Sequence, residues 1–460
     1  MTRALFASPV SAYARSYRIQ RTSAGRSLRP ALSHLRPLEP RVTVSAQAGT
    51  FHRAAPSSER GQTPLNSHAS GRSKSHGSRS EAPAAAGNHP PLPYFATAAK
   101  GTEGLLRDEL RGLGIRPLHG DRGGVHFGGD LAAAFRVCLQ SRVAIRVLEL
   151  RGSATVRDAD ELYQFVRSVS LDDVLTPLLS LAVSASVRSS QLTHSQFVAQ
   201  RVKDAVVDRQ RDQGTRRSNV DLNNPDVRLY LHLAKDIATL YVDLAGESLH
   251  RRGYRLHESA APLKESLAAA LLFWSSWDRE SPLIDPCCGS GTIAMEAAMM
   301  AAHWAPGLQR TSFSLEHHVR INDTWREQFA EQRALASDAI DRQRAELVSG
   351  SDIDVNAVSS AQDVAQELGL PLRFSRRDIL NLTPPASAAT LVTNPPYGIR
   401  LQGGESLVRR MAENLKHFAA CKLVVLSPDP TWRTALGNVP HREHTLFNGD
   451  IECRVYGWAL

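Results

Sequence analysis

The sequence predicts an α/β protein whose C-terminal part forms a parallel sheet with crossover helices. Short apolar strands alternate with longer helical patterns after residue 254, and this alternation is typical of parallel sheets. The 460 residues are too many for one ordinary core, and the first 91 show no hydrophobic period. We therefore expect a tail at 1–91, two small α+β units at 92–152 and 153–250, and the parallel sheet at 251–460.

Residues 1–91 are rich in Ser, Ala, Arg and Pro and should form a disordered basic extension. They hold twelve Arg and one Lys against three Glu, whereas the remaining residues hold 42 basic and 43 acidic side chains. The overall charge of +9 thus belongs to this tail and does not by itself indicate nucleic-acid binding. An organelle-targeting peptide is the alternative, although we expect a cytoplasmic, bacterial-type protein.

The cysteine spacing argues against a zinc-binding protein, and the hydropathy argues against a membrane-spanning protein. No two cysteines have the CxxC spacing of a zinc site, so we expect reduced thiols and no metal. No run of 18 apolar residues occurs, so we expect no membrane partner.

Periodicity and turn residues predict individual elements in each unit. In the first two units we expect helices at 101–113, 131–141, 162–169 and 196–213, and strands at 125–127, 145–150, 181–187, 227–234 and 239–244. In the last unit we expect strands at 283–284, 346–351, 391–392 and 423–426, and helices at 291–302 and 355–368.

Two motifs follow predicted strands of the last unit. Asp285-Pro-Cys-Cys-Gly-Ser-Gly-Thr292 is a glycine turn leading into a helix, where backbone N–H groups can approach a ligand, although a purely structural turn also fits. It is neither a P-loop nor a dinucleotide fingerprint. Asn394-Pro-Pro-Tyr-Gly398 is a rigid turn. Its Asn394 side chain and Pro395 carbonyl can accept both hydrogens of an amine, and Tyr397 can stack on a base.

Further polar residues complete the candidate site. Asp352 and Asp378 end or follow strands and can accept hydrogen bonds from a ribose and an adenine, or can simply cap helices. The basic linker 251–266 can cover the methionine end of a cofactor. A local excess of basic residues suits RNA phosphates, or else forms a solvated helix face. These residues are Arg188, Arg201, Lys203, Arg209, Arg211, Arg216 and Arg217, followed by Arg251, Arg252 and Arg255.

From about Tyr94 to its end, the sequence resembles the bacterial THUMP-domain methyltransferases that modify guanine N2 in large-subunit ribosomal RNA. The resemblance rests on the two motifs above and on Gly350-Ser-Asp352, Arg252-Gly-Tyr-Arg255, Ala261-Pro-Leu-Lys-Glu265, Phe95-Ala-Thr-Ala-Ala-Lys-Gly-Thr-Glu103 and Val202-Lys-Asp-Ala-Val-Val-Asp208. It implies a Rossmann-like methyltransferase domain at 251–460, behind a ferredoxin-like domain at 92–152 and an RNA-binding THUMP domain at 153–250.

The resemblance also implies a cofactor, a product and residue roles. The cofactor would be S-adenosylmethionine, and the product would be N2-methylguanosine in 23S ribosomal RNA. Cofactor contacts would come from Asp285, Cys287, Gly289, Gly291, Lys264, Asp352 and Asp378. The target base would meet Asn394, Pro395, Pro396 and Tyr397. Cys287 departs from the Met or other apolar residue of many relatives. Some relatives carry a second methyltransferase domain, and we expect this chain to be the form without it.

Three alternatives remain open at this stage. A nucleic-acid adenine-N6 methyltransferase uses the same Asn-Pro-Pro-Tyr tetrapeptide. A protein glutamine methyltransferase does so too, but the THUMP-like region argues against it. A catalytically silent RNA-binding protein is the third alternative, and the intact Asp285, Gly291 and Asn394 argue against that.

Overall fold

The computed structural model describes residues 92–255, 263–397 and 404–460. The predictions for the N-terminal tail and for Ala261, Pro262 and Gly398 therefore fall outside the described residues. No helix in the described part of the chain is both long and apolar enough to cross a membrane.

A first sheet of seven strands has the order β2-β3-β1-β4-β7-β6-β5. The strands are β1 (Tyr94–Thr97), β2 (Leu118–Asp121), β3 (Gly124–Phe127), β4 (Arg146–Thr155), β5 (Leu181–Arg188), β6 (Val227–Ala234) and β7 (Ile237–Asp243). Strand β4 pairs with β1 through its first half and with β7 along most of its length. The two small units expected from the sequence thus share one continuous sheet, because β4 runs through residues 152 and 153.

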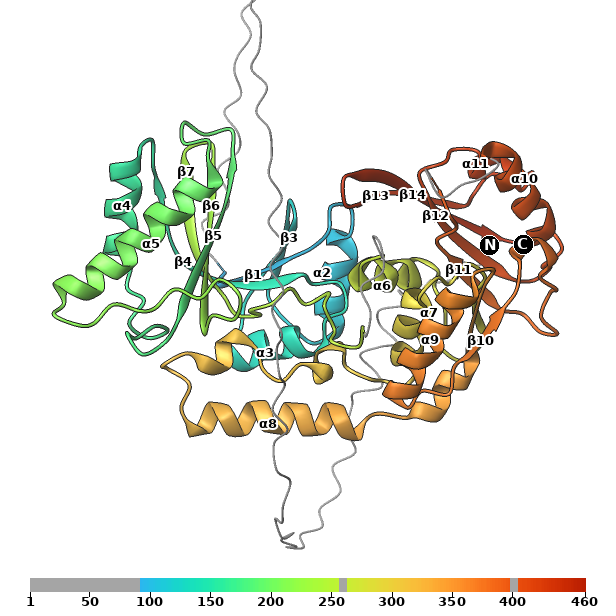
Figure 1. Ribbon diagram of the computed structural model, residues 1–460, viewed down its shortest axis with the longest axis horizontal. Helices are drawn as coiled ribbons and strands as arrows, with labels where there is room; N and C mark the ends of the chain where they lie inside the picture. Colours follow the sequence, from blue (N-terminus) through green and yellow to red (C-terminus); the bar gives the residue numbers. More distant parts are fainter. Residues whose placement is uncertain (1–91, 256–262, 398–403) are drawn as a thin grey trace, which may run out of the picture. The chain divides into compact units, whose positions relative to one another are not determined.

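Four helices accompany this sheet: α2 (Glu103–Gly112), α3 (Leu131–Gln140), α4 (Ala159–Ser168) and α5 (Ser195–Asp212). Helices α4 and α5 pack against each other, and α5 also packs against β5 (Figure 1). A turn at Lys235 and Asp236 joins β6 to β7, with φ of 51° and 60°. All the elements predicted for these two units occur within a few residues of their predicted bounds, whereas the strands β1 and β2 were not predicted.

The second sheet also has seven strands, in the order β10-β9-β8-β11-β12-β14-β13. The strands are β8 (Leu283–Asp285), β9 (Val348–Asp352), β10 (Arg373–Arg376), β11 (Thr390–Thr393), β12 (Lys422–Ser427), β13 (Arg442–Asn448) and β14 (Ile451–Ala459). The first five strands of this order run parallel, as the sequence predicts. The last two strands, β14 and β13, were not predicted from the sequence, and they form an antiparallel hairpin added to β12.

The helices of this part are α6 (Glu265–Trp274), α7 (Thr292–Ala301), α8 (Asp323–Asp338), α9 (Val355–Leu368), α10 (Gly404–Leu415) and α11 (Trp432–Ala435). Short 3-10 turns are η1 (Pro306–Gln309), η2 (Ser314–His317), η3 (Arg342–Leu347) and η4 (Ile379–Asn381). Helices α6 and α7 pack together (Figure 1), and every residue of both is buried. This explains why both helices carry apolar residues on all sides, apart from a few buried polar residues such as Glu265 and Glu296.

A buried ionic cluster joins the segment after α3 to helix α7. Arg142, Arg252 and Glu296 are each at most 1% exposed. Arg252 donates to Glu296 Oε1 at 3.2 Å and to the Arg142 carbonyl at 2.6 Å, and Arg142 Nη1 lies 3.7 Å from Glu296 Oε2. The expectation that Arg252 contacts RNA phosphates is therefore wrong, because its guanidinium is enclosed and paired inside the protein.

Candidate active site

Four polar side chains lie in a row along the carboxyl edge of the second sheet. Asp378 follows β10, Asp352 ends β9, Asp285 ends β8 and Asn394 follows β11. These four strands are neighbours in that order and run parallel. The structure therefore brings together residues that are separated by as many as 109 positions in the sequence, at the edge where open α/β sheets bind ligands.

The turn between β8 and α7 is held to β9 by backbone amides. The Cys288 amide donates to the Ser351 carbonyl at 2.9 Å, and the Gly289 amide donates to Asp352 Oδ2 at 2.8 Å. Gly291 has φ of +84°, and a Cβ there would lie 3.0 Å from the Cβ of Ala361. The turn thus requires a residue without a side chain at its last position.

Four buried side-chain oxygens at this edge have no close hydrogen-bond partner among the described residues; two are the hydroxyls of Ser351 and Thr393, and the other two belong to predicted site residues. These last two are Oδ2 of Asp285 and Oδ1 of Asn394. Asp285 is 1% exposed, and burial, together with the negative charge of Asp352, raises the pKa of its carboxyl to about 7. Buried acceptors without donors are costly, so both atoms are suited to meeting a ligand.

Tyr397 is held from outside the turn that contains it. Asn448, at the end of β13, donates from its side-chain amide to the Tyr397 hydroxyl at 2.9 Å. Pro395 is buried, whereas Asn394, Pro396 and Tyr397 are half-buried. The Asn-Pro-Pro-Tyr segment thus has a fixed backbone with partly accessible side chains.

Comparisons with known proteins agree with this arrangement. Residues 93–148 match the RlmL ferredoxin-like domain, 156–243 match the THUMP domain, and 252–456 match the RMKL-like methyltransferase domain. A putative RNA methyltransferase of Synechocystis sp. is 34% identical over 375 residues, which cover 80% of this chain and 97% of that protein. The chain belongs to the RlmL-like THUMP-domain methyltransferases. Its cofactor is S-adenosylmethionine.

Other relatives of this THUMP-domain methyltransferase are longer. The ribosomal RNA large subunit methyltransferase K/L of Syntrophotalea carbinolica is 42% identical over 390 residues, which cover 80% of this chain and 54% of that protein. The chain therefore spans about half the length of this relative.

Solved structures share the whole described fold. SMU.472, a putative methyltransferase complexed with S-adenosylhomocysteine, is 28% identical with a TM-score of 0.72, covering 80% of this chain and 97% of that one. A predicted N6-adenine-specific DNA methylase of Listeria monocytogenes is 29% identical with a TM-score of 0.71, covering 81% and 97%.

The residues at the carboxyl edge of the methyltransferase domain fit S-adenosylmethionine. A Cβ at Gly289 would meet no atom within 4 Å, so the turn borders open space, and Oδ2 of Asp285 has no close hydrogen-bond partner among the described residues. Asp352 accepts from the Gly289 and Asp354 amides, and Asp378 accepts from the Leu380 amide at 2.9 Å. Each carboxylate keeps lone pairs for hydroxyl or amine donors.

The remaining predicted cofactor residues are placed differently. Cys287 is half-buried in the turn beside Asp285, its amide donating to that carboxylate at 3.3 Å. Lys264 is exposed just before α6, and no hydrogen bond or ion pair joins it to the described residues of the turn.

One contact that was not predicted from the sequence joins the basic linker to the start of α7, directly after the glycine turn. Arg255 donates to Glu265 Oε1 at 2.5 Å, to the Leu263 carbonyl at 2.7 Å and to the Thr292 hydroxyl at 3.2 Å. Thr292 is the first residue of α7, directly after the glycine turn. The sequence did offer a signal for this contact. Arg255 and Glu265 carry opposite charges and stand at the two ends of the same linker, so an ion pair between them could have been expected.

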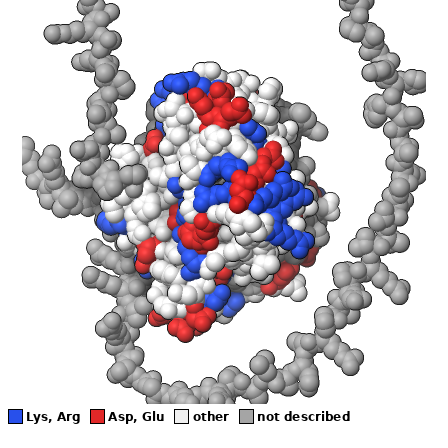
Figure 2. Space-filling model, turned by 90° about the vertical axis from the view of Figure 1, so that its left-hand side faces the viewer, with Lys and Arg blue, Asp and Glu red and all other residues white. Residues whose placement is uncertain are grey.

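The structure divides the predicted RNA-binding residues into two groups. Four of them pair with acidic side chains within the protein: Arg201, Lys203, Arg209 and Arg211. The other three, Arg188, Arg216 and Arg217, are exposed and form no ion pair with any described residue. Figure 2 shows the side on which α4 and α5 lie, where basic and acidic side chains are intermixed. That side is thus a network of ion pairs rather than a patch of one sign.

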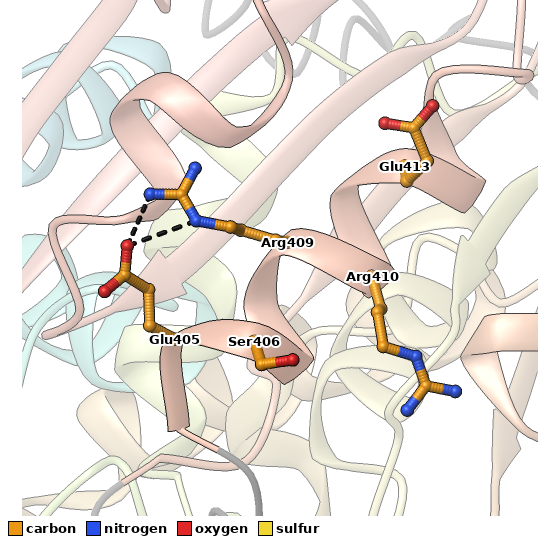
Figure 3. Close-up of a pocket in the computed structure, with 5 residues that line it drawn as sticks. All are labelled: Glu405, Ser406, Arg409, Arg410 and Glu413. Carbon is orange, nitrogen blue, oxygen red and sulfur yellow. Dashed lines mark hydrogen bonds and ion pairs between the residues drawn. The ribbon is translucent and has the colours of Figure 1, made fainter.

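A surface hollow on α10 lies apart from the row of site residues. It is lined by Glu405, Ser406, Arg409, Arg410 and Glu413, all from this one helix (Figure 3). Arg409 is paired with Glu405 one turn away. The hollow contains none of the polar residues at the carboxyl edge, so we assign it no part in the active site.

Proposed function

We propose that this chain transfers a methyl group from S-adenosylmethionine to the N2 amine of guanine in large-subunit ribosomal RNA. The observation that carries this proposal is the buried Oδ1 of Asn394, which has no donor among the described residues. It lies at the carboxyl end of β11, next to the strand that ends in Asp285. An amine of a target base is the donor that fits it.

Asn394 and the Pro395 carbonyl would act on the target amine. The lone pair of the guanine amine is delocalised into the ring, so the amine is a weak nucleophile. Accepting both of its hydrogens would concentrate the lone pair on nitrogen and hold it toward the methyl group. The transfer is then favoured mainly by positioning and by complementary charge. Pro395 and Pro396 would keep these acceptors in place, because their rings fix the backbone.

The cofactor would lie along the same edge. S-adenosylmethionine supplies a methyl group activated by its sulfonium. Asp352 would accept from its ribose hydroxyls, Asp378 from its adenine amine, and Asp285, Gly289 and Gly291 would border its methionine part. A cationic cofactor beside Asp285 would favour the ionised carboxylate.

The substrate would be RNA with an accessible base. A base inside a duplex cannot reach such a pocket, so the target would be unpaired or flipped out, with its face on Tyr397. The THUMP domain, at 153–250, would bind the RNA. The Syntrophotalea relative is a ribosomal RNA methyltransferase and the Synechocystis relative a putative RNA methyltransferase, which supports an RNA substrate. The exposed Arg188, Arg216 and Arg217 would contact phosphates.

Adenine-N6 methylation is the second candidate. The same tetrapeptide serves an adenine amine equally well, and the Listeria structure is described as a predicted N6-adenine-specific DNA methylase. The THUMP match favours RNA over DNA as the substrate.

Transfer of labelled methyl in vitro tests the proposal. The protein is incubated with labelled S-adenosylmethionine and deproteinised ribosomal RNA, and the RNA is digested to nucleosides. Label in N2-methylguanosine is the expected result. Label in N6-methyladenosine would replace guanine by adenine as the target, and label only in protein would exclude RNA chemistry.

A further inference from the structure

The β13–β14 hairpin reaches the proposed base pocket with its turn. Its two strands are joined by Gly449 and Asp450, and Gly449 has φ of +64°. Asn448, directly before this turn, donates to the Tyr397 hydroxyl at 2.9 Å. Tyr397 is the residue proposed to stack on the target base. Its phenol is therefore held by the tip of a hairpin that lies more than 50 residues further along the chain.

The other end of the hairpin is fixed to helix α6. Arg442 Nη1 donates to the Trp274 carbonyl at 2.8 Å and to the Ser276 hydroxyl at 2.7 Å. The His444 ring stacks on Trp274, with ring centroids 4.9 Å apart and planes 14° apart. The start of β13 thus has a defined place on the methyltransferase domain.

The ferredoxin-like region contacts the hairpin between these two ends. A Cβ on Gly101 would lie 2.4 Å from the Thr445 carbonyl oxygen, and Gly101 has φ of +94°. The Lys100 ammonium lies 4.0 Å from the centroid of the Phe447 ring, a cation–π contact. The turn after β1 therefore touches β13 at residues that directly precede Asn448.

The same turn is anchored within its own domain. The Glu103 carboxylate accepts from the Gly101 amide at 2.8 Å and from the Gly123 amide at 3.2 Å. Thr102 donates from its hydroxyl to the Ala99 carbonyl at 2.8 Å. The turn is thus a fixed support for the hairpin rather than a loose contact.

We propose that Asn448 is a positioning residue for Tyr397, and that the Lys100–Gly101 turn of the ferredoxin-like region supports the hairpin that carries it. This rests on the proposed function, in which the Tyr397 ring receives the target base. Rotation about the Cα–Cβ bond of a tyrosine moves the whole ring, and a hydrogen bond to the hydroxyl holds the far end of the ring in one place. The ferredoxin-like region thereby helps to shape the base pocket.

The proposal also accounts for the motif Phe95–Glu103, which has no role in the chemistry at the carboxyl edge. Its Lys100 and Gly101 contact the hairpin, and its Glu103 closes the turn that presents them. Only glycine fits at position 101, because any side chain would displace the Thr445 carbonyl.

A double-mutant cycle tests the hydrogen bond. Asn448→Ala and Tyr397→Phe each remove it, so each should slow single-turnover methyl transfer to ribosomal RNA by roughly three- to tenfold. The double variant should be no slower than the slower single variant, because both changes remove the same interaction. Asn448→Asp, with Tyr397 unchanged, should retain most of the transfer activity, since the phenol can donate a hydrogen bond to a carboxylate.

Two controls separate positioning from a general structural role. Affinity for S-adenosylmethionine, measured by calorimetry, should be unchanged in all these variants. Asn438→Ala should transfer methyl at the wild-type rate, because Asn438 is exposed and its contact to Trp458 uses the backbone carbonyl.

A pair of glycine variants tests the support from the ferredoxin-like region. Gly101→Ala and Gly114→Ala both place a side chain at positive φ, but a Cβ at Gly114 would meet nothing within 4 Å. Both variants should therefore strain the backbone to a similar degree. Gly101→Ala should slow methyl transfer more than Gly114→Ala does, because only Gly101→Ala also disturbs the hairpin. Lys100→Ala, which cannot strain the backbone, should slow transfer in the same direction but less.

Particular results would overturn the proposal. They are wild-type transfer by Asn448→Ala, independent losses that multiply in the double variant, or equal activities of the two glycine variants. If the wild-type protein still methylates guanine, such results leave the proposed function intact. A wild-type protein that transfers no methyl to RNA would overturn the proposed function, and this proposal with it.

Discussion

Asp285 and Asn394 each place a buried oxygen at the carboxyl edge of the sheet without a donor in the described structure. A buried acceptor left unpaired costs about 1–3 kcal/mol, so these two residues reduce the stability of the unliganded protein. The cost is recovered when a ligand supplies the donors. Residues of this kind are expected where binding rather than folding determines the side chain.

Asp285→Asn should separate stability from cofactor binding. The pKa of Asp285 is raised from 3.8 to about 7 in the folded protein, so its ionisation opposes folding. Its effect on stability is absent below pH 4, grows through the window from about 4 to 7 and is complete above it. The variant should thus be more stable than wild type at pH 8, by as much as about 4 kcal/mol, and nearly equal at pH 4.

The same variant should bind S-adenosylmethionine more weakly, because the cationic cofactor loses a carboxylate. Urea unfolding at both pH values and calorimetry with the cofactor provide the two measurements. An equal pH dependence of stability in wild type and variant, or unchanged cofactor affinity, would contradict the role given to Asp285.

Asn394→Ala should leave cofactor binding nearly intact while methyl transfer falls roughly 100- to 1000-fold. The side-chain oxygen is proposed to act on the target amine and not on the cofactor. Calorimetry and single-turnover transfer to ribosomal RNA measure the two effects on the same preparation. A variant that loses both together would place Asn394 in the cofactor site instead.

Helix α5 shows that a count of basic residues does not identify an RNA contact. Arg209 donates to the carbonyls of Arg167 and Val169, both at 2.8 Å, and so satisfies the C-terminal end of α4. Arg216 and Arg217 follow the helix and are exposed. Only the exposed arginines, Arg216 and Arg217, are available to bind phosphates.

We expect Arg216→Ala combined with Arg217→Ala to weaken RNA binding without altering thermal stability. For a single-stranded site, the slope of log affinity against log salt should fall by about 1.4 if both residues contact phosphates. Arg209→Ala should instead lower the melting temperature. Fluorescence anisotropy over a salt series and a thermal melt distinguish the two cases. An unchanged salt slope in the double variant would exclude these two arginines.

The elements predicted well from the sequence are those whose signal is local. The turn after β8 and the Asn-Pro-Pro-Tyr turn after β11 are each defined by a few adjacent residues that fix the backbone. The β13–β14 hairpin was missed, although Asn448-Gly449 between two strand-like segments is a hairpin signal. The burial of Arg252 could not be read from the sequence, because it depends on Glu296 and Arg142, which are distant in the chain.

At the scale of the whole molecule, the buried ionic cluster connects the ferredoxin-like region with the methyltransferase domain. Arg142 also donates to the carbonyls of Met299 and Trp304, at 3.2 and 2.6 Å. The Glu296 carboxylate is the one acidic group paired with both arginines among the described residues. The two regions are thus joined by buried charge as well as by a common hydrophobic core.

Glu296→Ala should lower the free energy of unfolding by about 3–5 kcal/mol, because it leaves two guanidiniums buried without a carboxylate. Glu405→Ala is a matched control, since it breaks an exposed pair within α10 and should cost at most about 0.5 kcal/mol. Urea unfolding of both variants measures the difference. Similar losses in the two variants would show that the buried cluster does not stabilise the junction.

The activity that we propose for the whole protein is methylation of guanine N2 in large-subunit ribosomal RNA. Mass spectrometry of ribosomal RNA nucleosides from a strain lacking the gene tests it most directly, with wild type and Asn394→Ala each returned to that strain. We expect a loss of N2-methylguanosine from large-subunit RNA, restored by the wild-type gene and not by Asn394→Ala. Unchanged N2-methylguanosine, or a loss of N6-methyladenosine in its place, would contradict it.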